Sequence, residues 1–528
     1  MDEAPPALET SRATWWPWWG LAMAVALVLY ALNLVFGDLN QDEGWYLYAA
    51  RLVSERQLPY VDFAHTQPPV LCFTYGLAWP LVARWGVEGG RLFTAMLGLA
   101  GALLAAVAAR RLAPAPRRDA AALLAFALVA LNAYHTYFTT IVKTYALCGF
   151  FLAAAIALLT VQRGRIGRLA AYLAGVGLAL AAGTRISAGV MIPVALAGLW
   201  CVRDRRPGDW VRLGIGAGVV GLLFAAPFLW LAPDSFLFGV FHYHTGRRTD
   251  NLTTWFVYRA GFVSRFVQAY FVPVSVAIAA AAARFFRAEG RCRAPDESAW
   301  LRRTAWAGVA GGTLLHITAA VPYEDYQVIL APLAAVALAS WVAALLVTAK
   351  AERWVVAVLI MVSIGAAFSS PINQSWFVSG RDRIWWRLKE KPHLQVLRET
   401  AARVRALAGD SRRLLTQDTY LAVEAGLRVP RGLELGPFSY YPDLDTATAR
   451  SRHVLNRELM QALLRSGPAP VAAVSGYGLS VASPAVAELP EPEQRSLRAA
   501  LAERYIPAGT VRPFGQADTT LELFIIKP

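Results

Sequence analysis

The stretch GDLNQDEGWYLYAARLVSERQLPYVDFAHTQPPV, residues 37–70, separates the first two hydrophobic blocks of the chain. Its segment 42–56 has no Gly or Pro after Gly44 and places apolar residues at helical spacing, which predicts an interfacial helix with aromatic side chains at headgroup level and charges facing water. Asp42 and Glu43 begin this helix, where the helix dipole favours ionised carboxylates. Acidic residues are also ordinary at helix starts, so the pair alone does not indicate a function.

The overall composition is that of an integral membrane protein. Of its 528 residues 56% are hydrophobic and only 16% are charged, and the mean hydropathy is +0.41. This apolar content is well above that of soluble domains. The net charge of +15 comes from arginines clustered between apolar blocks, as in cytoplasmic loops, which argues against nucleic-acid binding. The high Arg and Ala content is typical of a GC-rich bacterial genome.

A spanning helix needs about 20 apolar residues. On that criterion we predict eleven spans, near residues 18–36, 91–109, 120–138, 144–161, 168–184, 186–202, 211–231, 266–286, 304–320, 328–348 and 354–370. The apolar block at 68–86 is predicted to lie flat on the outer surface, because the Arg-rich loops then all fall on the same side. These loops contain 19 Lys or Arg, against two in the three short outer loops. The positive-inside rule therefore predicts a cytoplasmic N-terminus and an outer loop at 37–90.

The composition changes after Pro371. Residues 372–528 have the composition of a soluble domain, with a helix expected at 393–409 and strands at 412–418, 470–475 and 520–527, separated by Gly and Pro. An odd number of preceding spans places this α/β domain outside the cytoplasm. The prediction is thus a polytopic α-helical membrane domain, residues 1–371, followed by an extracytoplasmic α/β domain.

Polar residues gather at the outer ends of the predicted spans. Asp62, His65 and Gln67 follow the Asp-Glu pair in the same loop, ahead of Pro68-Pro69. Buried cations near a membrane surface are costly unless they meet an anion, and several cations share this side: Lys143, Arg185, and the cluster His242, His244, Arg247 and Arg248. A carboxylate base facing cations fits an anionic, lipid-linked substrate with a phosphate leaving group. For each cation singly, contact with a lipid headgroup is an equal alternative.

The first loop resembles that of the GT-C superfamily of glycosyltransferases, in particular the group of bacterial lipid A aminoarabinose transferases and protein O-mannosyltransferases (family 39 type). The resemblance rests on Asp42-Glu43-Gly44-Trp45-Tyr46 after the first span, on a surface helix beginning at Pro68-Pro69, and on the Arg-Arg turn after the next span. It implies a GT-C fold, a polyprenyl-phosphate sugar donor, Asp42 as general base with Glu43 beside it, and Tyr46 and the basic residues around the donor.

Two positions depart from the family pattern. Gln67 is neutral where His or Lys is common before Pro-Pro, so His65, or Lys143 with Arg185, would take the phosphate. Trp45 replaces a basic residue of the aminoarabinose branch.

The predicted function is an inverting glycosyltransferase in the bacterial inner membrane that transfers a sugar to a lipid, glycan or protein. No cofactor or metal is predicted, although Asp42, Glu43 and Asp62 could supply oxygen ligands to Mg²⁺. A transporter or flippase of lipid-linked sugars is the alternative, and an accessory membrane subunit is a third reading.

Overall fold

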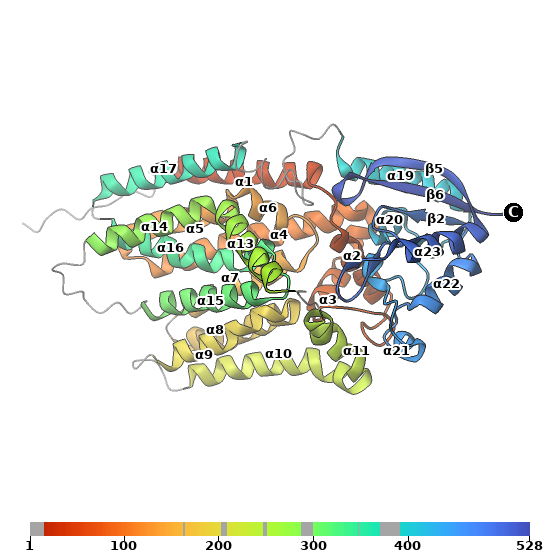
Figure 1. The fold of residues 1–528 in the computed structure, drawn as a ribbon. Coiled ribbons are helices and arrows are strands. Elements are labelled where there is room, and N and C mark those ends of the chain that lie inside the picture. The colour runs from red at the N-terminus through yellow and green to blue at the C-terminus, as the bar shows by residue number, and fades with distance from the viewer. Residues whose placement is uncertain are drawn as a thin grey trace, which may run out of the picture.

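A computed structural model describes residues 15–161, 164–201, 208–246, 251–286, 299–346, 348–369 and 391–528. Figure 1 shows an elongated molecule with long helices bundled at one end and a sheet flanked by helices at the other. Among the described residues, six helices are long and apolar enough to cross a membrane: α1 (Trp16–Phe36), α4 (Trp79–Leu112), α8 (Gly164–Thr184), α10 (Asp209–Leu231), η5 (Glu324–Leu330) continuing into α16 (Ala331–Leu345), and α17 (Ala349–Phe368). The chain is a multi-pass membrane protein.

The other predicted spans correspond to helices that are shorter, broken or, like α15 (Ala299–Thr318), absent from this set of long apolar helices although they have 20 residues. The pair α13 (Leu252–Ala269) and α14 (Phe271–Phe286) is bent by 87° and would add a seventh span if it crosses as one unit. The region 120–138 is divided because Asn132 caps a new helix, its side chain accepting from the backbone N–H of His135. These regions contain α5 (Arg118–Ala130), α6 (Ala133–Phe138), α7 (Thr144–Leu159), α9 (Met191–Trp200) and α15, with short turns η2 (Ala115–Arg117) and η3 (Ile186–Val190). The count of eleven spans stays a prediction.

The helix predicted in the first outer loop is α2 (Gln41–Ser54). Asn40 and Glu43 form a reciprocal capping box at its start, which explains why the helix begins there. The predicted exposure is wrong. Most of α2 is buried, because the C-terminal part of the chain covers it: the Arg51 side chain donates to the carbonyl of Leu427, and the backbone N–H of Val429 donates to the Tyr48 hydroxyl.

The block at 68–86 forms short helices, as predicted for surface helices of the loop. Helix α3 (Val70–Leu77) leads into the first turns of α4, which are separated from the long span by a break at Gly86. The φ of Gly86 is 61°, a left-handed conformation that favours glycine. After the break, the backbone N–H of Val87 donates to the carboxylate of Glu424 at 2.8 Å, so a side chain from the C-terminal part caps the long helix.

The C-terminal part contains a four-stranded sheet in the order β1-β2-β6-β5. Strands β1 (Leu415–Thr416) and β2 (Val471–Val474) are parallel, whereas β6 (Thr519–Ile526) is antiparallel to β2 and to β5 (Tyr505–Phe514). The predicted helix and all three predicted strands are present. The other elements are α19 (His393–Ala408), α20 (Thr419–Ala425), η8 (Gly436–Ser439), α21 (Thr446–Ser451), α22 (Arg457–Ser466), α23 (Glu491–Arg504), η9 (Gln516–Asp518) and a small hairpin, β3 (Val481–Ala482) with β4 (Ala487–Glu488).

One hydrophobic core joins the first outer loop to the sheet region. It contains Trp45, Tyr46 and Leu71 of the loop together with Leu415 and Leu523 of the strands. The first outer loop and the C-terminal part therefore share one hydrophobic core. The predicted division at residue 371 lies in residues 370–390, outside the described residues, and stays a prediction.

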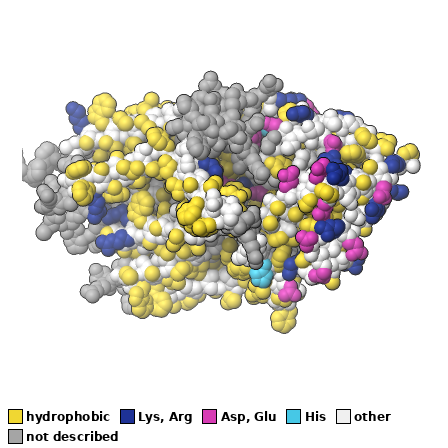
Figure 2. All heavy atoms as spheres, viewed as in Figure 1, with side chains coloured by type: hydrophobic (Ala, Val, Ile, Leu, Met, Phe, Trp, Pro, Cys, Tyr) yellow, Lys and Arg dark blue, Asp and Glu magenta, His cyan; other side chains and the backbone are white. Residues whose placement is uncertain are grey.

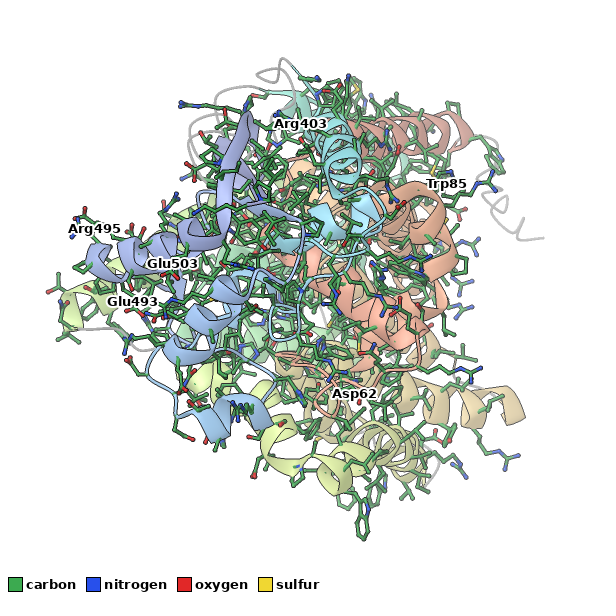
Figure 3. All side chains as sticks on the ribbon, turned by 90° about the vertical axis from the view of Figure 1, so that its right-hand side faces the viewer. Asp62, Trp85, Arg403, Glu493, Arg495 and Glu503 are labelled. Atoms are coloured by element: carbon green, nitrogen blue, oxygen red, sulfur yellow. The ribbon has the colours of Figure 1, made fainter. Side chains whose placement is uncertain are left out.

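The surface differs between the two ends. In Figure 2 acidic side chains lie over the C-terminal part, hydrophobic side chains cover much of the bundle, and the charged side chains toward the far end of the bundle are Lys and Arg. Viewed from the C-terminal end, Glu493, Arg495 and Glu503 lie along one edge of the molecule (Figure 3).

Candidate active site

A cavity of about 540 Å³ lies where the bundle meets the C-terminal part. Its wall combines the start of α2, the segment before α7, the start of η3 and the turn η5 with Phe438, Val486 and Gln516 of the C-terminal part. Gln516 also accepts a hydrogen bond from the backbone N–H of Gln41 at 3.1 Å. The cavity is therefore closed by segments from both ends of the sequence. Its volume is in the range typical of small-molecule sites.

Asp42 lies in this cavity beside a lysine. Its Oδ2 atom is 3.3 Å from Nζ of Lys143, and its Oδ1 atom accepts from the indole N–H of Trp45 at 3.3 Å. The Asp42 side chain is 30% exposed, whereas that of Lys143 is only 8% exposed. On its other side, Lys143 Nζ is 3.2 Å from Oδ2 of Asp325, at the start of η5. The ammonium group is thus shared between two carboxylates.

Glu43 points away from the cavity into the bundle. Its carboxylate accepts two hydrogen bonds from Arg91 at 2.6 and 2.7 Å, and both side chains are fully buried. Arg91 also donates to the carbonyls of Gly37 and Asp38, and Glu43 accepts from the backbone N–H of Val142. This network fixes the start of α2 and the segment that leads to Lys143. Glu43 was predicted beside the base; the geometry gives it a positioning role.

Arg185 contributes a second cation to the cavity. Its guanidinium group lies 4.3 Å from the ring centroid of Tyr326 and 5.1 Å from that of Tyr145. It also donates to the Thr144 hydroxyl at 3.3 Å. The two tyrosine rings hold the guanidinium by cation–π contact and leave its charge available to an anion in the cavity.

Three further predicted residues line the cavity. Tyr46 is buried in its wall, next to Trp45. Gln67 and His244 meet there, with 3.4 Å between Nε2 of each side chain, and the His244 ring nitrogen lies 2.9 Å from the carbonyl oxygen of Thr66. His244 belongs to the short helix α12 (Tyr243–Thr245), which follows α11 (Pro233–Leu237) and the π-helical turn η4 (Phe238–His242).

Other predicted residues lie apart from the cavity. Asp62 is exposed, and its carboxylate accepts from the backbone N–H of Leu58 in a local turn; Figure 3 shows it near the surface at the C-terminal end of the molecule. His65 is buried against the rings of Trp45, Tyr60 and Phe63. Burial lowers the pKa of His65 to about 3, so its ring is neutral near pH 7 and does not supply the expected charge.

Of the remaining members of the predicted histidine and arginine cluster, only His242 lies in the described residues. His242 is exposed and is not among the lining residues. Arg247 and Arg248 lie in residues 247–250, outside the described residues.

Sequence reasoning missed the wall opposite Asp42. Asp325 and Glu324 belong to η5, and Glu324 accepts from Arg265 of α13 at 2.8 Å. His316 of α15 lies beside them, hydrogen-bonded to Ser187 and Gln327. A signal existed: VPYEDYQV, residues 321–328, carries an acidic pair in a short outer loop, as the first loop does. Within the described residues, no group of three or more His, Cys, Asp or Glu is arranged to hold a metal ion.

Comparisons with known proteins give a clear result for the fold only. No protein-family model and no curated protein match the chain. Among solved structures, ArnT from Cupriavidus metallidurans bound to undecaprenyl phosphate is similar over 96% of this chain and 98% of its own, with a TM-score of 0.60 at 13% identity. ArnT in the apo state is similar over 97% and 98%, with a TM-score of 0.60 at 15% identity.

A more distant likeness is to the oligosaccharyltransferase of Archaeoglobus fulgidus in the apo form, over 94% of this chain and 74% of that chain, with a TM-score of 0.50 at 10% identity. The chain therefore has the fold of these membrane proteins along nearly its whole length. The predicted GT-C fold is confirmed.

Proposed function

We propose that the chain is an inverting glycosyltransferase that transfers a sugar from a polyprenyl-phosphate donor to an acceptor at the outer face of the bacterial inner membrane. The observation that carries the proposal is the partly exposed carboxylate of Asp42, which faces the cations Lys143 and Arg185 in one cavity. The fold supports it, because ArnT, with the same fold, was crystallised with undecaprenyl phosphate.

Asp42 takes the role of general base. It accepts the proton of an acceptor hydroxyl or amine, which attacks the anomeric carbon of the donor sugar. The new bond to the acceptor forms as the bond to the phosphate oxygen breaks, so the configuration inverts and polyprenyl phosphate leaves with the bonding electrons. A phosphate leaving group needs charge neutralisation rather than protonation, and Arg185 with Lys143 supplies it. The alternative substrate contacts predicted for Asp62 and His65 have no geometric support, because neither side chain lines the cavity.

The orientation follows from the placement of charge. The Arg-rich loops would lie in the cytoplasm, and the cavity and the C-terminal part would face the periplasm. Lipid tails would remain in the bilayer beside the bundle while the sugar phosphate enters the cavity. The acceptor, whether lipid, glycan or protein, would approach from the C-terminal side.

The decisive experiment replaces Asp42 by Asn in the purified full-length protein. Undecaprenyl-phosphate-linked hexoses and pentoses would be supplied with candidate acceptors, and the released undecaprenyl phosphate measured. We expect transfer to fall roughly 10² to 10⁴-fold, the usual contribution of a positioned base, while binding of undecaprenyl phosphate persists.

The matched control is Asp119→Asn, which neutralises an aspartate paired with Arg110 at the start of α5, away from the cavity. It should turn over like the wild type. Wild-type activity in Asp42→Asn would refute the base assignment. Movement of lipid-linked sugar across liposomes, without transfer from any donor, would instead favour the transporter alternative.

A further inference from the structure

The cavity contains a lysine held by two carboxylates of unequal exposure. Lys143 Nζ is 3.3 Å from Asp42 and 3.2 Å from Asp325, and the two aspartate side chains are 30% and 11% exposed. Asp42 Oδ2 is therefore in contact with an ammonium group. The ammonium group therefore competes with an incoming acceptor for this carboxylate, because both bind through the lone pairs of its oxygens.

We propose that Asp325 is a positioning residue that holds Lys143 while the donor phosphate displaces Asp42 from the ammonium group, so that donor binding itself releases the base. This inference rests on the proposed function. It adds an order to the reaction: the phosphate-linked donor binds before the acceptor is activated.

The unequal exposure of the two aspartates decides which one is released. A phosphate oxygen entering the cavity competes with both carboxylates for the same ammonium group. Water can hydrate the more exposed Asp42 once it loses its ion pair, whereas the more buried Asp325 would be left desolvated and unpaired, which is costly. Lys143 should therefore remain paired with Asp325, while the donor phosphate replaces Asp42 as its second partner.

The turn that carries Asp325 is suited to this role. The adjacent residue, Tyr326, stacks on Arg185 at 4.3 Å, so η5 contacts Lys143 and Arg185 through neighbouring side chains. The turn is continuous with α16, and Val328, Ile329 and Leu330 within it are buried. Asp325 is thus fixed to the bundle, and its side chain is less exposed than that of Asp42.

The test compares single and double variants of the full-length protein. In Asp325→Asn, Lys143 has Asp42 as its remaining partner of the two, so the base stays occupied. We expect kcat to fall roughly 10 to 100-fold, in the range of a misplaced catalytic group. The KM for the donor should not rise, because a negative charge has been removed from an anion-binding cavity. Lys143→Met should do the opposite and weaken binding of undecaprenyl phosphate.

A double variant separates positioning from a structural role. If Asp325 acts by releasing Asp42, then Asp42→Asn with Asp325→Asn should transfer sugar no more slowly than Asp42→Asn alone. Asp325→Glu should recover most of kcat. Additive losses, a raised donor KM with unchanged kcat, or wild-type kinetics in Asp325→Asn would each overturn the proposal.

Folding and the basic activity have their own checks. Binding of undecaprenyl phosphate by Asp325→Asn should be at least as tight as in the wild type, which shows that the cavity is intact; loss of this binding would count against the proposal. The proposed function fails separately, if the wild type transfers no sugar from any of the donors supplied. Asp119→Asn again serves as the control for neutralising a carboxylate.

Discussion

Two acidic pairs from distant parts of the chain each contribute an aspartate to the cavity. In Asp42-Glu43 the aspartate contacts Lys143 and the glutamate contacts Arg91. In Glu324-Asp325 the aspartate contacts Lys143 and the glutamate contacts Arg265. The two glutamate–arginine ion pairs differ in solvent exposure. The side chains of Glu43 and Arg91 are fully buried, whereas those of Glu324 and Arg265 are 16% and 34% exposed. The two pairs therefore differ in placement: Glu43 lies in the bundle, away from the lining of the cavity, whereas Glu324 and Asp325 both line it.

The largest expected effect comes from breaking the buried pair. Arg91→Met leaves the Glu43 carboxylate buried without its cation, which typically destabilises a protein by roughly 3–5 kcal/mol. We expect a marked loss of folded protein, measured by thermal unfolding in detergent. Arg110→Met removes an exposed pair with Asp119 and should cost about 1 kcal/mol or less. Equal stabilities of the two variants would contradict the contrast drawn between buried and exposed pairs.

The next largest effect on stability is expected from a buried carboxylate that is hydrogen-bonded to hydroxyl groups. Asp418 accepts from Ser475 and Tyr420, each at 3.0 Å, and burial raises its pKa from 3.8 to about 6. The folded state therefore binds its proton more tightly than the unfolded state, so stability falls as pH rises from about 4 to about 6, by roughly 3 kcal/mol in total.

The measurement is the hydrogen exchange of β2, corrected for the pH dependence of intrinsic exchange. Asp418→Asn should lessen the loss of protection between pH 4 and pH 6, because the side chain no longer titrates. An unchanged pH dependence in this variant would show that Asp418 is not the group responsible.

The smallest effect is expected at the partly exposed pair. Glu324→Gln weakens the contact with Arg265 but leaves both groups partly hydrated, so stability should fall by about 1 kcal/mol or less. The thermal unfolding temperatures of Glu324→Gln and Arg91→Met, measured side by side, compare the two losses directly. A loss as large as that of Arg91→Met would mean that the two glutamates are equivalent supports.

The sequence predicted those features that depend on local composition or on short motifs. Apolar length predicted the membrane bundle, and the Asn40–Glu43 capping box explains why α2 begins as the helical spacing predicted. The same loop led correctly to a GT-C fold. Lys143 and Arg185 were found because cations between apolar blocks need anions, and the structure brings both into the cavity with Asp42.

The features that the sequence did not predict depend on contacts between residues far apart in the chain. The capping box with Asn40 distinguishes Glu43 from Asp42 locally, but the burial of Glu43 in the bundle depends on Arg91, which lies 48 residues later. Asp325 reaches Lys143 across 182 residues, and helix packing alone sets that distance. The burial of α2 was missed because its amphipathic pattern fits a membrane surface as well as the surface of α20.

The capping of α4 by Glu424 has a consequence for how the chain is made. The backbone N–H of Val87 is bonded by the side chain of Glu424, which is 337 positions downstream. Helix α2 packs against α20, which is synthesised at the same late stage. The first outer loop is therefore synthesised well before α20, although its final structure requires contacts with that helix. During biosynthesis, we expect this loop to remain accessible to proteases until the C-terminal part has been translated and has folded onto it.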